Sequence, residues 1–117
     1  MTIQIKRAYD PRSPSDGYRV LVDRLWPRGL SKEELKLDAW MKEVAPSNEL
    51  RKWFGHEEAK WAEFKKRYFN ELKQQPELTA ELRKRSRGGK LTLLYSSREE
   101  VHNNAVALKE YLERKSR

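Results

Sequence analysis

The stretch "VLVDRLWPRG", residues 20–29, changes character after its third residue. The apolar run at residues 20–22 is typical of a strand that is covered on both faces, as strands in parallel sheets are. Four large polar or aromatic side chains follow this run: Asp23, Arg24, Trp26 and Arg28. Polar groups crowded at the end of a buried strand indicate either a ligand site or a structural network whose hydrogen bonds are satisfied.

Two further stretches predict strands on either side of this one. "TIQIKRAY", residues 2–9, alternates apolar and polar side chains, which is typical of a half-exposed edge strand. "KLTLLYSS", residues 90–97, is predicted to be the third strand. A long helical segment separates strands two and three, so we expect these two strands to be parallel, with a right-handed crossover. The expected fold is a small α/β domain: a mainly parallel three-stranded sheet, a multi-helix insertion between strands two and three, and a C-terminal helix.

Capping patterns place the helices of the insertion. Ser31 and Glu34 have the spacing of a capping box, so a helix is predicted to begin at Lys32. Asp38 is predicted to cap a second helical segment, "AWMKEV". "NELRKWF", residues 48–54, is predicted to form another helix, because a glycine follows it.

The remaining helices follow from apolar spacing and from capping. Helices are predicted over residues 57–73 and over residues 76–85. Ser97 and Glu100 repeat the capping-box spacing, so the last helix, "SREEVHNNAVALKEYLERK", is predicted to start there. Its expected apolar stripe is Val101, Ala105, Leu108 and Leu112.

Length and composition limit the class of protein. The 117 residues fit one domain, residues 1–117. The chain contains no cysteine, which excludes disulfides and Cys-based metal sites and makes the cytoplasm the expected location. Because it has neither a signal-peptide core nor a long apolar run, we expect no membrane partner. His56 and His102 are its only histidines and lack a metal-binding spacing, so we expect no dedicated metal site and no cofactor. The alternative is a Mg²⁺ ion that arrives with a phosphate ligand and is held partly by Asp23.

The net charge of +8 is concentrated in the second half of the chain. Residues 1–58 carry 11 basic and 10 acidic side chains, whereas residues 59–117 carry 15 basic and 8 acidic ones. The densest run contains Arg83, Lys84, Arg85, Arg87 and Lys90. Such a run predicts a patch that binds nucleic acid or another polyanion, or, alternatively, a solvated helix end.

The topology also predicts a ligand site. Ligands of open α/β sheets bind beyond the carboxyl ends of the strands, which brings together residues 23–28 and residues 95–104. Guanidinium groups bind phosphate and carboxylate groups bidentately, and an indole can stack on a ring. We therefore expect a small phosphorylated or carboxylated ligand, with Asp23 and His102 as candidate catalytic residues. The candidate ligand-binding residues are Arg24, Trp26, Arg28, Arg51, His56, Tyr95, Ser96, Asn103 and Asn104.

Each of these groups also has a purely structural interpretation. Asp23 could pair with one arginine while Trp26 closes the core. Residues 102–104 could form a solvent-facing polar turn. Arg51 and His56 could lie solvated at helix ends.

Three separated motifs resemble a known family. They are "VLVDRLWPRGLSK", "WMKEVAPSNELRKWFGHEEAKWAEFKKRY" and "LLYSSREEVHNNAVAL". Together they resemble the YeaO-like branch of a bacterial family of uncharacterised proteins (domain of unknown function 488). The resemblance implies a small α/β domain over nearly the whole chain, and it implies no activity. Where the family motif has Lys-Asp, this chain has Arg98-Glu99, which keeps both charges but lengthens the acidic side chain.

Three classes of function are therefore compatible with the sequence. The first is a small-ligand site, or an enzyme acting on a nucleotide-like substrate, built at the carboxyl ends of strands two and three. The second is a nucleic-acid accessory protein that uses the basic second half. The third is a protein-interaction domain in which the polar strand end only holds the fold together.

Overall fold

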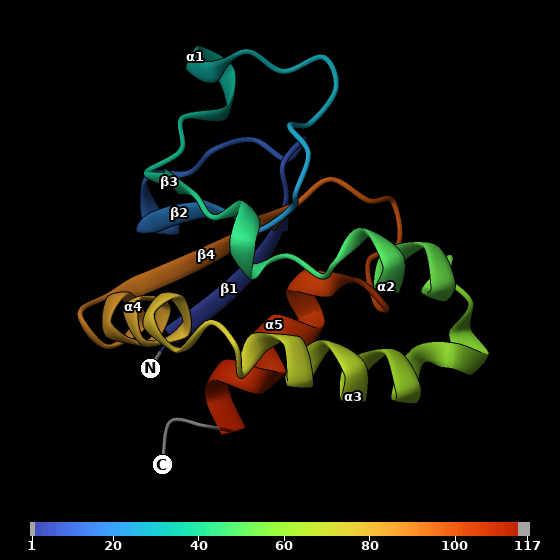
Figure 1. Ribbon diagram of the computed structural model, residues 1–117. Helices are drawn as coiled ribbons and strands as arrows, with labels where there is room; N and C mark the ends of the chain where they lie inside the picture. The colour runs from blue at the N-terminus through green and yellow to red at the C-terminus, as the bar shows by residue number, and fades with distance from the viewer. Residues whose placement is uncertain (1, 115–117) are drawn as a thin grey trace.

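A four-stranded parallel sheet forms the centre of the computed structural model, which describes residues 2–114 (Figure 1). The strand order is β1-β4-β2-β3. The strands are β1 (Thr2–Arg7), β2 (Tyr18–Leu21), β3 (Ala39–Trp40) and β4 (Lys90–Tyr95). The prediction of a parallel α/β sheet is confirmed, with β1 at one edge and β2 beside β4.

The prediction of three strands was wrong, because the segment "AWMKEV" supplies a fourth strand. Ala39 and Trp40 pair with β2, and only Lys42–Val44 form a short 3-10 helix. Asp38 does not cap a helix; its Oδ2 accepts a hydrogen bond of 2.8 Å from the backbone N–H of Arg19 in β2. This contact draws the segment into the sheet, so a strand interrupts the predicted multi-helix insertion.

Five α-helices surround the sheet in the described part of the chain. They are α1 (Lys32–Leu35), α2 (Asn48–Phe54), α3 (Trp61–Leu72), α4 (Pro76–Arg87) and α5 (Asn104–Arg114). The capping box at Ser31 and Glu34 is confirmed in both directions. Ser47 caps α2, and Gly55 ends it in the left-handed region, at φ 52°.

Both faces of the central strands are buried, as the apolar run at residues 20–22 predicts. Val20 and Leu93 belong to the main core cluster, which packs against helices α2 to α5. Leu21 and Leu94, which alternate with them along the strands, belong to a smaller cluster with Leu35 of α1. In Figure 1, α3, α4 and α5 lie below the sheet and α1 lies above it.

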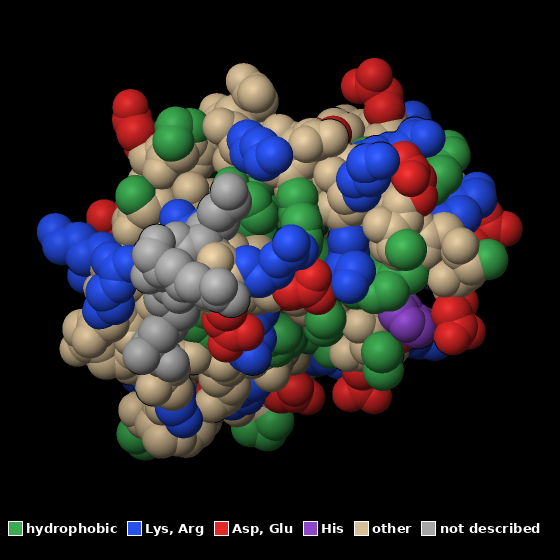
Figure 2. Space-filling model, turned by 90° about the horizontal axis from the view of Figure 1, so that it is seen from below, with side chains coloured by type: hydrophobic (Ala, Val, Ile, Leu, Met, Phe, Trp, Pro, Cys, Tyr) green, Lys and Arg blue, Asp and Glu red, His purple; other side chains and the backbone are tan. Residues whose placement is uncertain are grey.

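Basic and acidic side chains are interspersed over the face formed by α3, α4 and α5 (Figure 2). Lys65 of α3 contacts Glu110 of α5 at 3.1 Å. Within α3, Arg67 pairs with Glu63, and within α4, Arg85 pairs with Glu81. Pairs of this exposed kind contribute little stability individually, but they keep neighbouring charges balanced. No helix in residues 2–114 is long and apolar enough to cross a membrane.

The last helix begins later than predicted. It starts at Asn104, and Asn103 caps it, because the Asn103 Oδ1 accepts a hydrogen bond from the backbone N–H of Val106 at 3.0 Å. Ser97 caps no helix; its Oγ accepts a hydrogen bond from the backbone N–H of Glu99. The expected apolar stripe therefore loses Val101, whose side chain is 62% exposed.

A buried ionic network joins β1 and β2 to the α1 segment. Asp16 is 1% exposed, and its Oδ2 lies 2.6 Å from Nη1 of Arg19 and 3.0 Å from Nζ of Lys6. The backbone N–H of Ser13 donates to the same oxygen. Arg19 also donates to the carbonyl oxygen of Leu35 at 2.7 Å, so the network reaches the end of α1.

This network makes the stability of the fold sensitive to acid. Burial by itself would raise the pKa of Asp16, but hydrogen bonds from Ser13, Lys6 and Arg19 outweigh burial and lower the pKa from 3.8 to about 2. Because the pKa is lower in the folded state, this stabilisation is present above the unfolded pKa and is lost as the pH falls through the folded one. We expect it to contribute about 2 kcal/mol to the decrease in the free energy of unfolding below about pH 4, measured by urea denaturation.

The Asp16→Asn variant should lack that part of the acid dependence, whereas Glu33→Gln, a change at an exposed carboxylate, should keep it. A carboxyl titration of Asp16 by NMR in the wild type provides a second measurement. An unshifted titration would contradict the prediction even if the variant failed to fold.

Two substitutions test which residue caps α5. Asn103→Ala should lower the free energy of unfolding by about 1 kcal/mol, because the side chain satisfies an N–H at the start of α5. Ser97→Ala should cost about half of that or less, because Ser97 supports only a turn. Urea denaturation of both variants measures the difference in the free energy of unfolding. A larger loss for Ser97→Ala than for Asn103→Ala would mean that the helix begins at Ser97, as the sequence predicted.

Candidate functional site

A cleft of about 410 Å³ opens at the carboxyl edge of the sheet. It lies between the segments that follow β2 and β4 and the helix α2, which are far apart in sequence. In Figure 1 the orange segment that follows β4 runs toward α2. The predicted residues that line the cleft are Asp23, Arg24, Arg51, His56, Ser96, Asn103 and Asn104.

Asp23 holds the two strand ends and α5 together. Its Oδ2 accepts hydrogen bonds of 2.8 Å from both the backbone N–H and the hydroxyl of Ser96, at the end of β4. Its Oδ1 accepts a hydrogen bond of 3.0 Å from Nδ2 of Asn104, which also donates to the carbonyl oxygen of Val22. Trp40 Nε1 donates to the backbone oxygen of Asp23 at 2.8 Å. Asp23 therefore pairs with donors from β4, α5 and β3 rather than with an arginine.

The loop at residues 96–103 is held in place from within and from β1. The Glu99 Oε2 accepts hydrogen bonds from the backbone N–H groups of Val101 and His102, which lower the pKa of Glu99. Arg7, at the end of β1, donates through Nε to the carbonyl oxygen of Ser97 at 2.9 Å and through Nη2 to that of Ser96. Hydrogen bonds from within the chain therefore hold the loop that supplies Ser96, Ser97 and Asn103 to the cleft.

Arg24 is the least satisfied polar side chain on the wall. Its Nη2 lies 3.4 Å from the carbonyl oxygen of Ala45, a long contact for a hydrogen bond. Its Nε and the Nη2 of Arg83 in α4 are the two buried side-chain nitrogen atoms within residues 2–114 that have no hydrogen-bond partner. Buried polar groups in folded proteins nearly always have a partner, and leaving one without costs about 1–3 kcal/mol. The guanidinium of Arg24 therefore makes few hydrogen bonds to the described residues.

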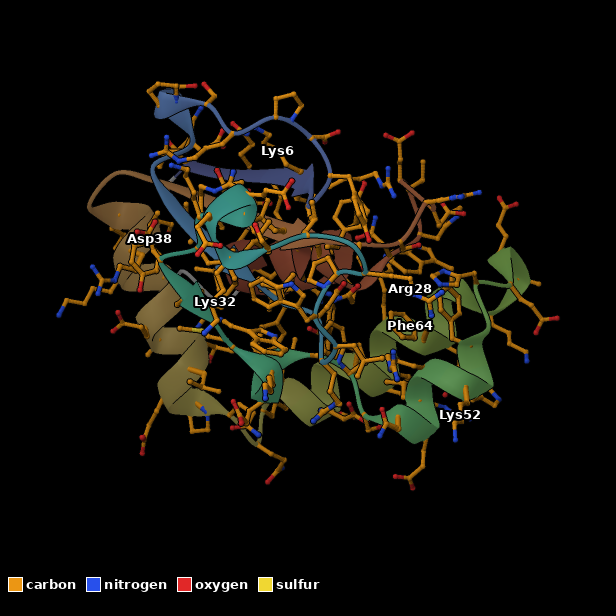
Figure 3. The ribbon with its side chains drawn as sticks, turned by 90° about the horizontal axis from the view of Figure 1, so that it is seen from above. Lys6, Arg28, Lys32, Asp38, Lys52 and Phe64 are labelled. Carbon is orange, nitrogen blue, oxygen red and sulfur yellow. The ribbon has the colours of Figure 1, made fainter. Side chains whose placement is uncertain are left out.

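Helix α2 adds further basic groups at the opposite side. Arg51 and Lys52 lie in its last turn and His56 follows it, and all three side chains are exposed and line the cleft. Arg51 Nη2 also donates to Oδ1 of Asn48 at 2.8 Å, which orients it. In Figure 3, Lys52 lies at the outer margin of the molecule.

The floor of the cleft is apolar. Phe54 and Phe64 are 3% and 2% exposed, and their rings stack with centroids 4.3 Å apart. Figure 3 shows Phe64 in the interior, between the loops and α3. Ala45 and Pro46 extend this floor, and the exposed Leu25 stands at its edge.

Four of the predicted site residues do not line the cleft. Trp26 packs edge-on against Trp40 on the other face of the sheet, at 5.3 Å between centroids, so it closes the smaller core cluster. Arg28 is exposed, and its carbonyl oxygen accepts a hydrogen bond from the hydroxyl of Tyr9. Tyr95 is buried in the main core. His102 packs against Trp61 at 5.1 Å.

The basic run at residues 83–90 is divided among several local contacts. Arg83 Nε donates to the carbonyl oxygen of Leu112, and Lys90 Nζ donates to Oε1 of Gln4. Arg85 pairs with Glu81 and lies over the ring of Tyr18. The exposed members that remain are Lys84 and Arg87.

Sequence analysis missed Lys52 and Arg7. Lys52 follows Arg51 directly, so the end of α2 carries a basic pair that could have been noticed. The place of Arg7 follows from the sheet topology. Because β1 is parallel to β4, the carboxyl end of β1, where Arg7 lies, must be at the same edge of the sheet as the cleft. Within residues 2–114, no group of three or more His, Asp or Glu side chains is placed to hold a metal ion.

The sequence matches one family and several proteins. Residues 2–117 match DUF488-N3i, described as "Inactive DUF488-N3 subclade". The chain is 48% identical over 112 residues to "Uncharacterized protein YeaO" of Escherichia coli (strain K12), covering 96% of this chain and 97% of that protein. It is 39% identical over 110 residues to "Uncharacterized protein Mb3100c" of Mycobacterium bovis, covering 94% of this chain and 92% of that protein. No solved structure matches. The predicted resemblance to the YeaO-like branch is confirmed.

The hydrogen bonds to Asp23 predict its role in stability. Asp23→Ala leaves the Ser96 N–H, the Ser96 hydroxyl and the Asn104 amide without their acceptor, so the free energy of unfolding should fall by about 1–3 kcal/mol. Urea denaturation measures this loss. Arg28→Ala, a change at an exposed residue outside the cleft, is the matched control and should cost about 0.5 kcal/mol or less. Equal costs at the two positions would contradict the structural role of Asp23.

Proposed function

This chain belongs to the DUF488-N3i family, the inactive DUF488-N3 subclade, and from that premise we propose that its cleft binds a small phosphorylated or carboxylated ligand without transforming it. The single observation that carries the proposal is Arg24, which lines the cleft and whose one hydrogen bond to the described residues is the long contact with Ala45. An oxyanion in the cleft supplies the acceptor that this guanidinium lacks.

The charges around the cleft support an anion rather than a cation. Arg24, Arg51 and Lys52 are basic, whereas Asp23 is the acidic residue among the lining side chains. Three hydrogen bonds occupy the two carboxylate oxygens of Asp23, so this carboxylate repels an incoming anion less than a bare one. Two positive charges therefore remain in excess, before any contribution from His56.

Two observations favour binding over catalysis. The carboxylate oxygens of Asp23 accept hydrogen bonds from Ser96 and Asn104, so Asp23 is poorly available to act as a general base. His102, the other candidate for proton transfer, packs against Trp61 outside the cleft lining. The description of the family as inactive agrees with a site that binds only.

Nucleic-acid binding by the basic second half is the alternative that the net charge of +8 favours. The local contacts of Arg83, Arg85 and Lys90 reduce its support, because they divide the basic run among three neighbours. This alternative predicts that the affinity for nucleic acid falls steeply as the salt concentration rises. The affinity should also fall in a variant that carries both Lys84→Glu and Arg87→Glu.

The ligand site is tested by a thermal-shift screen of inorganic phosphate, nucleoside monophosphates and small carboxylates at moderate salt. A ligand at 100 times its dissociation constant should add about 2.7 kcal/mol to the free energy of unfolding. For a domain of this size, each kcal/mol raises the melting temperature by roughly 3–6 °C. The shift should disappear in Arg24→Gln, because that change removes the guanidinium from the cleft.

Two further variants control this screen. Arg51→Gln changes an exposed residue of the cleft and should weaken binding without loss of the fold, which keeps the proposal testable if Arg24→Gln is unstable. Arg28→Gln removes the same charge outside the cleft and should leave the shift unchanged. An equal loss in Arg28→Gln and Arg51→Gln would mean that net charge alone, rather than the cleft, binds the anion.

A further inference from the structure

We propose that the ligand of this cleft carries its anionic group on an aromatic ring, as a small aryl phosphate or aryl carboxylate does. This inference rests on the proposed function and adds the chemistry of the uncharged part of the ligand. It follows from the apolar and aromatic side chains that line the cleft beside the basic groups and that a simple oxyanion would leave without a partner.

Apolar side chains, two of them aromatic, form the floor of the cleft. Phe54 and Phe64 stack with their planes 25° apart, and both line the cleft although they are almost wholly buried. Pro46 and Ala45 are also buried and continue the same lining. A hydrated phosphate makes no favourable contact with such a surface, whereas a ring packs on it and leaves water.

The chain turns after α2 in a way that places a third ring beside this floor. His56 has φ 57° and follows Gly55 at φ 52°, so two successive residues occupy the left-handed region, which is uncommon for a residue with a side chain. A hydrogen bond of 3.0 Å from the backbone N–H of Glu57 to the carbonyl oxygen of Phe54 fixes the turn. The His56 ring centroid lies 5.7 Å from that of Phe54, so the imidazole extends the aromatic surface to the exposed rim.

Leu25 completes the apolar side at the rim. Its side chain is 65% exposed and lines the cleft. A lone exposed leucine needs no explanation, but this one follows Arg24 in the chain and lines the same cleft as Phe54 and Phe64. A ring that packs against Leu25 in the cleft removes apolar surface of both groups from water.

The size of the cleft favours a small molecule over a longer chain. Its volume of about 410 Å³ falls within the range of about 300–1,000 Å³ that small-ligand sites occupy. Arg24, Arg51 and Lys52 supply the charge that holds the anion, and the floor supplies surface for one ring. The combination matches a molecule with one charged end and one flat apolar end.

The test compares three probes by isothermal titration calorimetry: inorganic phosphate, phenyl phosphate and phenol. Phenyl phosphate should bind at least about tenfold more tightly than inorganic phosphate, because its ring is buried. Leu25→Ala should weaken phenyl phosphate binding about threefold and leave phosphate binding unchanged, since the lost methyl groups contact only the ring. Leu25 is mostly exposed, so its removal leaves the core intact.

Val101→Ala is the matched control, because Val101 is similarly exposed, at 62%, and does not line the cleft. It should leave the binding of all three probes unchanged. If phosphate and phenyl phosphate bind equally well in the wild type, the aromatic subsite is overturned and the anion site stands. If phenol binds as tightly as phenyl phosphate, or if none of the probes binds, the proposed anion site itself is overturned.

Discussion

The hydrogen bonds to the carboxylate of Asp23 hold together the carboxyl edge of the sheet, where the cleft lies. A carboxylate is an acceptor without protons of its own, so donors from several segments can converge on it. Here the donors come from Ser96 at the end of β4 and from Asn104 at the start of α5. This convergence joins the end of β2, the end of β4 and the first residue of α5, and all three line the cleft.

The hydrogen bonds to Asp23 also determine which groups are left to pair with Arg24, the next residue in the chain. Since Ser96 and Asn104 occupy Asp23, the side chain of Arg24 has no ion-pair partner among the described residues beside it. Its contact with Ala45 at 3.4 Å leaves most of the hydrogen-bonding capacity of the guanidinium unused. An arrangement in which Asp23 paired with Arg24 would satisfy both groups and would leave the cleft nearly neutral on this side.

Local rules predicted the parts of the structure that local contacts decide. The burial of residues 20–22 on both faces and the capping box at Ser31 and Glu34 follow directly from the sequence. The same capping pattern at Ser97 failed, because Glu99 turns its carboxylate to the loop backbone and Asn103 caps the helix instead. The helix predicted after Asp38 failed because a long-range hydrogen bond to Arg19 outweighed the local preference.

The cleft itself could be predicted only in part, because its two sides obey different rules. The side formed by residues 23–24 and 96–104 follows from parallel topology, which the sequence predicts. The side formed by α2 depends on tertiary packing, in which Phe54 stacks on Phe64 and thereby brings Arg51 and His56 to the strand ends. Apolar spacing predicts that these rings are buried, but not which surface they cover. The two sides of the cleft, which come from the strand ends and from α2, therefore meet only in three dimensions.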